Sequence, residues 1–143
     1  MKIRPFEPDD ETRVVALWAR CGLLRSWNDP RKDIARKLRV QSDLFLVGLI
    51  EDELVAVVMA GYEGHRGWIN YLAVDPERRR AGLGRAMMNE AVSRLRELGC
   101  PKVSLQLRSE NRDVIAFYSR LGFVKDDVVS FGKRLERDGD SDP

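Results

Sequence analysis

The sequence predicts a single α+β domain, with a mixed, mostly antiparallel central sheet and helices on both faces. Two observations lead to this fold class. Three strand-like apolar runs follow one another before the longest helical pattern, and shorter helical and strand patterns lie on either side. No repeat, low-complexity tract or Pro/Gly/Ser linker divides the chain. We therefore place one domain at residues 1–135 and a disordered acidic tail at 136–143.

The first part of the chain predicts one strand and two helices. Residues 2–4 form the strand, and acidic residues after Pro8 suit the start of a helix that ends near Gly22. The segment 28–30 places Asn and Asp before a proline at the first position of a second helix. The loop between the helices carries an exposed-looking Trp27.

The middle of the chain predicts three antiparallel strands in succession. The runs 44–50 and 54–62 are rich in apolar and β-branched residues, and the acidic turn between them indicates a hairpin. A turn at 64–67 leads into a third run, 68–74. Asp75-Pro76 ends it, because proline lacks the N–H that a strand ladder needs.

The remaining elements predict a helix from Gly82 to Gly99, a strand over 103–107, a helix over 112–121 and a last strand over 128–131. In the helix from Gly82 to Gly99 the apolar residues repeat every three or four positions, and Gly99 stands where a left-handed residue ends a helix. This is the strongest helical pattern of the sequence.

Composition excludes several classes of protein. The net charge of +2 is too even for a strongly basic nucleic-acid binder. The two cysteines form no CxxC motif and the single histidine has no partner, so we expect no metal site. Neither a membrane-length apolar run nor a signal-peptide core is present, so we expect a cytoplasmic protein with reduced Cys21 and Cys100 and no membrane partner.

The turn before the longest helix predicts an anion site. A strand, a turn with Gly82 and Gly84, and a helix start gather unpaired N–H groups, and four arginines surround them: Arg78, Arg79, Arg80 and Arg85. The turn lacks the Gly-Lys-Ser/Thr ending of a Walker loop, and Met87 stands where a dinucleotide motif has Gly or Ala. The alternative is that the glycines only ease the helix start and the arginines form a solvated face.

Two segments resemble motifs of the GCN5-related N-acetyltransferase (GNAT) family. Arg79-Arg-Ala-Gly82-Leu-Gly84 is similar to its diphosphate motif, Gln/Arg-x-x-Gly-x-Gly/Ala. The segment 111–123, with its Asn, Tyr and Gly-Phe, is similar to its second motif. Shorter segments, among them Trp27-Asn-Asp-Pro30, further resemble the bacterial YpeA-type acetyltransferases.

The resemblance implies acetyl-CoA as cosubstrate and no metal. Backbone groups would bind its diphosphate and pantetheine arm. Asn111 would hydrogen-bond the arm, or only cap a helix, and Tyr118 would be the catalytic acid that protonates the departing sulfur, or only a packing residue. The cofactor-binding residues implied are Leu72, Ala73, Val74, Arg79, Arg80, Ala81, Gly82, Leu83, Gly84, Arg85 and Asn111.

The general base has no clear candidate. Gln106 stands where some relatives have a glutamate, and an amide cannot accept the proton of the amine. Glu63 is a weak candidate, and both His65 and Glu110 are weaker. We leave the base unassigned.

The function implied by the resemblance is acetyl transfer to a primary amine of a small molecule or protein, by direct attack in a ternary complex. The alternative is a noncatalytic acyl-CoA-binding or sensing module on the same fold. The acceptor's identity stays open, as does oligomeric state, with a homodimer as one option. The acceptor side would be built from the first two helices and from Trp27, Asn28, Tyr62, Tyr71 and Arg108.

Overall fold

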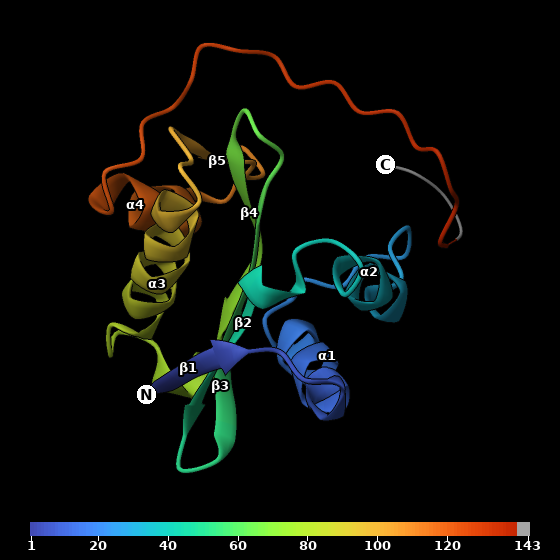
Figure 1. Cartoon of the computed structure of the whole chain (residues 1–143), viewed down its shortest axis with the longest axis vertical. Coiled ribbons are helices and arrows are strands. Elements are labelled where there is room, and N and C mark those ends of the chain that lie inside the picture. Colours follow the sequence, from blue (N-terminus) through green and yellow to red (C-terminus); the bar gives the residue numbers. More distant parts are fainter. Residues whose placement is uncertain (140–143) are drawn as a thin grey trace.

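The computed structural model describes residues 1–139, which form one five-stranded sheet in the order β1-β2-β3-β4-β5 (Figure 1). The first four strands pair antiparallel, and β5 pairs parallel with β4. The mixed, mostly antiparallel sheet is therefore confirmed. The strands are β1 (Lys2–Pro5), β2 (Phe45–Ile50), β3 (Glu53–Tyr62), β4 (Gly67–Val74) and β5 (Val103–Leu105).

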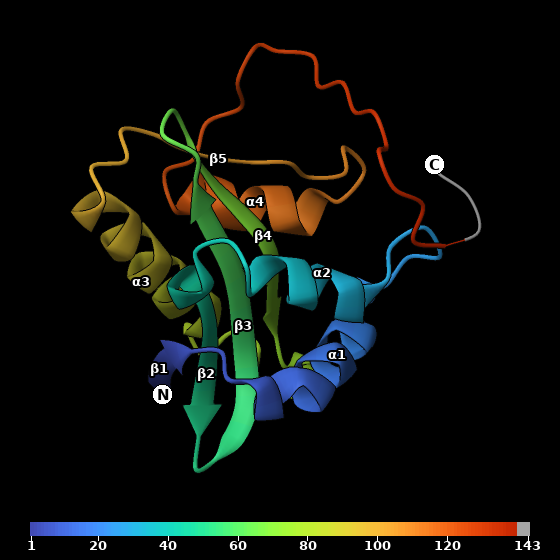
Figure 2. The same ribbon diagram turned by 45° about the vertical axis from the view of Figure 1, so that its right-hand side comes forward.

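Four α-helices cover the two faces of the sheet. One pair, α1 (Glu11–Arg20) and α2 (Pro30–Lys37), lies on one face, and the other pair, α3 (Leu83–Glu97) and α4 (Arg112–Arg120), lies on the opposite face (Figure 2). The predicted cap of α2 is confirmed, because the Asp29 carboxylate accepts hydrogen bonds from the first-turn N–H groups. Three short 3₁₀ turns complete the element order: η1 (Pro8–Asp10), η2 (Ser42–Leu44) and η3 (Pro76–Arg78).

Strict alternation along the central strands builds two cores. Leu46 and Val58 pack with the α3 helix, whereas their neighbours Phe45 and Val57 pack with α1 and α2. All four side chains are fully buried. A strand covered on both faces has no polar side, which explains why these segments are continuously apolar in sequence.

A bulge interrupts this alternation in β4. Val57 of β3 pairs with Ala73 and Met59 pairs with Asn70, so two β4 residues lie opposite one β3 residue. Tyr71 in the bulge has a φ of 55°, in the left-handed region. As a result Ile69 packs with the α3 core, whereas Tyr71 packs with the α1 core.

The predicted last strand, 128–131, is wrong. Within the described residues the chain after α4 forms no strand, and the side chain of Phe131 is 94% exposed. The short β5 pairs with β4 over only three residues and does not extend the sheet to this segment. Residues 124–139, which we call the C-terminal strap, instead cross from α4 towards α2 (Figures 1 and 2). The predicted disordered tail, 136–143, lies partly outside the described residues and stays a prediction.

Asp10 links the first turn of the fold to two arginines. Its carboxylate is buried and accepts hydrogen bonds from Arg4 (2.7 Å), Arg13 (2.8 Å) and the Glu7 N–H (2.8 Å). Burial alone raises the pKa of Asp10, but these three donors together lower it. The charged form is therefore favoured in the folded protein.

We expect Asp10→Asn to lower the free energy of unfolding at neutral pH by about 2 kcal/mol. A lowered folded pKa stabilises the fold above the unfolded pKa of about 3.9, and this stabilisation disappears as the pH falls through the folded pKa. The difference between wild type and variant should thus shrink in acid. Urea unfolding at several pH values measures it, and a difference that grew towards acid would contradict the assignment.

Candidate active site

One edge of β4 is free beyond its first three residues. Pairing with β5 ends at Ile69 and Leu105, and within residues 1–139 no strand lies on that side of β4 from Asn70 onwards. One backbone group near the end of this stretch is engaged, since the Val74 carbonyl accepts a 3.3 Å hydrogen bond from the Cys21 thiol. Such an edge offers N–H and C=O groups to an extended ligand, as an added strand would use them.

The predicted anion turn lies at the end of this edge. Gly82 is the N-cap of α3 with a φ of 77°, and no side chain caps the first-turn N–H groups. Three of the four arginines are exposed and make no ion pair in the described part of the chain: Arg79, Arg80 and Arg85. Arg78 is different, since it pairs with Glu53 at 2.8 Å. The turn thus combines unpaired N–H donors with three available positive charges.

Gly84 brings the predicted parts of the site together. A Cβ atom on Gly84 would lie 3.1 Å from the ring of Phe117 in α4 and 3.6 Å from the side chain of Val74. The start of α3, the end of β4 and the helix α4 therefore meet at this position. The missing side chain lets the helices approach, which is a packing role in addition to the motif role.

Helix α4 carries the two residues assigned from the second motif. Asn111 is exposed, and its side-chain oxygen caps the Val114 N–H at 3.4 Å, so the capping alternative is observed. That bond uses the oxygen and leaves the amide nitrogen as a donor. Tyr118 is buried, with its ring edge-on to Phe117 and Phe123, and burial raises the pKa of its phenol to about 12.

The carboxylate of Glu63 is held in a turn. It accepts hydrogen bonds from the N–H groups of Arg66 and His65, and these bonds lower its pKa. A carboxylate with a lowered pKa is a weaker base, which argues against Glu63. Gln106 donates a 2.5 Å hydrogen bond to Ser130 of the C-terminal strap.

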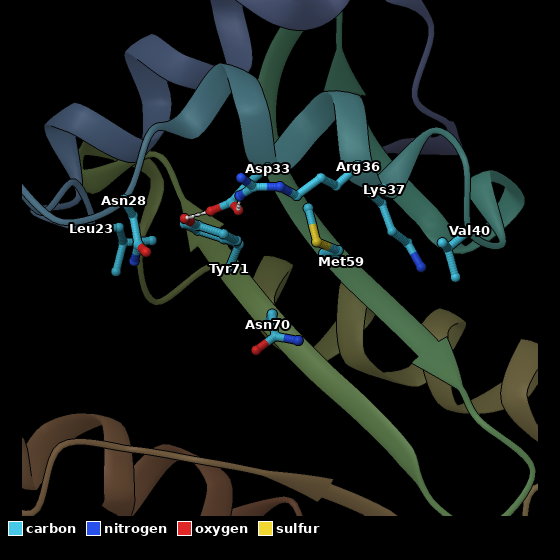
Figure 3. Close-up of a pocket in the computed structure, with 9 residues that line it drawn as sticks. All are labelled: Leu23, Asn28, Asp33, Arg36, Lys37, Val40, Met59, Asn70 and Tyr71. Atoms are coloured by element: carbon cyan, nitrogen blue, oxygen red, sulfur yellow. Dashed lines mark hydrogen bonds and ion pairs between the residues drawn. The ribbon is translucent and has the colours of Figure 1, made fainter. Parts of the chain in front are cut away.

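A cavity of about 540 Å³ lies between α2 and the strands β3 and β4 (Figure 3). Inside it the hydroxyl of Tyr71 donates a 2.6 Å hydrogen bond to Asp33, and the Tyr71 ring stacks on Trp18 with centroids 4.1 Å apart. The bulge makes this possible, because it turns both Asn70 and Tyr71 towards α2. The lining residues are Leu23, Asn28, Asp33, Arg36, Lys37, Val40, Met59, Asn70 and Tyr71.

Two of the five residues expected on the acceptor side line this cavity, namely Asn28 and Tyr71. The other three do not. The Arg108 guanidinium lies 5.6 Å from the centre of the Trp27 ring, and the Tyr62 hydroxyl donates to the Gly64 carbonyl.

The polar side of α2 was not among the predicted site residues. Asp33, Arg36 and Lys37 follow one another at helical spacing of three and four, so a helical projection would have placed them on one face. Lys37 is buried, and its ammonium donates a 2.5 Å hydrogen bond to the Ala60 carbonyl. Burial lowers the pKa of Lys37. Lys37 is thus bonded to the backbone of β3, whereas Arg36 on the same cavity wall is only half-buried.

The chain is similar to known acetyltransferases in sequence profile and in fold. The profile of the acetyltransferase (GNAT) family matches residues 9–123. Ard1 from Thermoplasma volcanium is 28% identical, with a TM-score of 0.75 over 86% of this chain and 82% of that chain. The ribosomal-protein-S18-alanine N-acetyltransferase of Escherichia coli, at 23% identity, has a TM-score of 0.70 over 85% of this chain and 76% of its own.

A third structure is glucosamine-6-phosphate N-acetyltransferase from Arabidopsis thaliana, 21% identical, with a TM-score of 0.69 over 94% of this chain and 98% of its own. At such identities the last two likenesses show the fold. The similarity to the YpeA-type proteins stays a prediction. None of the helices in residues 1–139 has the length and apolar character needed to cross a bilayer.

Proposed function

Because the chain belongs to the acetyltransferase (GNAT) family, whose cosubstrate is acetyl-CoA, we propose that it transfers acetyl directly to a primary amine in a ternary complex. The amine belongs to a small molecule or a protein. The observation that carries the proposal is the free edge of β4, which runs into the uncapped start of α3. An extended ligand with an anionic end fits this arrangement, and acetyl-CoA has that form.

Binding of the cosubstrate would depend mainly on the backbone. The N–H groups from Arg80 to Arg85 receive the diphosphate, and the main chain of Leu72, Ala73 and Val74 pairs with the pantetheine arm. Arg79 and Arg85 add charge, and the amide nitrogen of Asn111 hydrogen-bonds the arm. Leu72, Ala73 and Val74 lie on β4 and Asn111 caps α4, so fixing these groups on binding costs little conformational entropy.

The chemistry would use one side chain of α4. Acetyl-CoA supplies a reactive thioester. A tyrosine phenol is protonated at neutral pH, and burial raises the pKa of Tyr118 further, to about 12. Tyr118 donates this proton to the sulfur as negative charge develops there, and because a thiol is the stronger acid, the transfer depends on the position of the hydroxyl. N–H groups of β4 stabilise charge on the carbonyl oxygen. Holding amine and thioester together accounts for much of the acceleration.

The acceptor would enter the cavity beside α2. Asp33 is the carboxylate that attracts a protonated amine there. The Tyr71 hydroxyl orients this carboxylate through its 2.6 Å hydrogen bond to Oδ2. The base that removes the proton from the amine stays unassigned.

A noncatalytic acyl-CoA-binding module is the second candidate. The observation in its favour is that Gln106 stands in place of a base and bonds to Ser130. This candidate predicts coenzyme A binding without thiol release from acetyl-CoA across a broad panel of amines.

Calorimetric titration with coenzyme A, followed by a thiol-release assay with acetyl-CoA and that panel, tests the proposal. We expect binding and amine-dependent release. Arg85→Ala should weaken coenzyme A binding by about tenfold, since it removes a charge at the anion turn. The matched control is Arg96→Ala, an exposed arginine at the other end of α3. Equal effects of the two variants, or no binding by wild type, would reject the proposed cosubstrate site.

A further inference from the structure

Arg36 on the cavity wall already holds a carboxylate. Its guanidinium makes two hydrogen bonds with Asp138 of the C-terminal strap, Nη1 to Oδ2 at 2.8 Å and Nη2 to Oδ1 at 2.6 Å. The Asp138 side chain is fully buried, although it lies far along the chain from Arg36. Paired contacts of this kind match the planar fork of arginine to a planar carboxylate.

The surroundings of Asp138 form a small anion site. The Asp29 N–H at the start of α2 points to the same carboxylate at 3.4 Å. The hydrogen bonds from Arg36 lower the pKa of Asp138 most, and the charge of Lys32 adds to them. A second strap residue, Glu136, lies 3.5 Å from Arg36 but is 67% exposed. Only Asp138 is enclosed.

The rest of the strap makes exposed polar contacts, among them those of Asp126, Ser130 and Arg134, but buries little apolar surface. Side chains that could bury apolar surface remain in solvent, with Val128 at 77%, Val129 at 80% and Leu135 at 91% exposure. Burial of apolar area therefore stabilises the docked strap little. A ligand carboxylate that replaced Asp138 would still pair with Arg36, so the exchange would leave no unpaired guanidinium.

We propose that Arg36 is the carboxylate subsite of the acceptor cavity, that Asp138 occupies it in the free protein, and that the acceptor is an amine which also carries a carboxylate. This inference rests on the proposed function, since it names the substrate class of that site. Asp33 and Arg36 are in contact at 3.1 Å and present opposite charges from one face of α2. Asp33 attracts the ammonium of the acceptor, and Arg36 binds its carboxylate in place of Asp138.

The subsite is tested by measuring the binding of candidate acceptors in the absence of acetyl-CoA, so that no acetyl transfer occurs. The probes are glycine, β-alanine, γ-aminobutyrate, glycylglycine and triglycine. Each is compared with the corresponding amide, which lacks the negative charge of the carboxylate. Calorimetric titrations use the protein with and without saturating coenzyme A. We expect wild type to prefer at least one carboxylate over its amide by about tenfold, as one charge-assisted pair provides.

Variants separate the two halves of the inference. Asp138→Asn should tighten binding of the preferred carboxylate about fivefold to tenfold and leave its amide unchanged, because the internal competitor has lost its charge. Asp126→Asn, the same substitution elsewhere on the strap in an exposed pair with Lys102, should change neither. Arg36→Gln should abolish the preference, and Arg36→Lys should restore only part of it.

Equal binding of carboxylates and amides would overturn the inference, as would failure of every probe to bind Asp138→Asn. These outcomes are distinct from failure of the proposed function. Thiol release with neutral amines and no preference for carboxylates would support the acetyltransferase function and reject the Arg36 subsite. Binding of carboxylates through Arg36 without any thiol release would support the subsite and reject the acetyltransferase function.

Discussion

Tyr118→Phe is expected to lower kcat about 100-fold and to leave the affinity for coenzyme A unchanged. The ring packs edge-on against Phe117 and Phe123, and phenylalanine preserves those contacts. Only the hydroxyl is lost, and with it the proton for the departing sulfur. Steady-state kinetics with acetyl-CoA and calorimetry with coenzyme A measure the two quantities separately.

The pH profile adds a second readout for Tyr118. Since burial raises its pKa to about 12, the phenol stays protonated through the range in which amines become nucleophilic. We therefore expect kcat of the wild type not to fall up to about pH 10 through loss of this proton. Tyr62→Phe removes a hydroxyl bonded to the Gly64 carbonyl outside the cavity and serves as control. Wild-type turnover by Tyr118→Phe would show that another group is the acid.

Trp18→Ala should lower the free energy of unfolding by about 3–5 kcal/mol. The indole is fully buried between Tyr71, at 4.1 Å, and Phe45, at 6.4 Å between ring centres. Its removal leaves a large cavity under the bulge. The Tyr71 ring then loses its stacking partner, which holds the Tyr71 hydroxyl towards Asp33. Chemical denaturation followed by circular dichroism gives the stability change.

Trp18→Phe is the matched variant for this position. Within the described residues the indole N–H is buried without a hydrogen-bond partner, so phenylalanine removes an unpaired donor and keeps most of the contact area. We expect it to cost far less than the alanine variant. A loss below about 1 kcal/mol for Trp18→Ala would mean that the core closes around the gap.

Local patterns were enough to predict most elements. The stripe of apolar residues in α3, the cap at Asp29 and the acidic hairpin turn before Glu53 each depend on residues within a few positions of one another. The anion turn could also be predicted from neighbouring residues, because its glycines and arginines lie close together along the chain. The acceptor cavity could not be predicted in this way, since its wall joins Asp33 of α2 to Tyr71 of β4.

The amino-acid order by itself determined the helices, the three central strands and the turn at Gly82, because their signals repeat over two to four residues. Packing in three dimensions decided which face each β4 side chain takes after the bulge, and that the segment 128–131 forms no strand. It also decided that Asp138 reaches Arg36. Strand register and ion pairing join residues far apart in sequence, and no periodicity in one segment encodes the position of another.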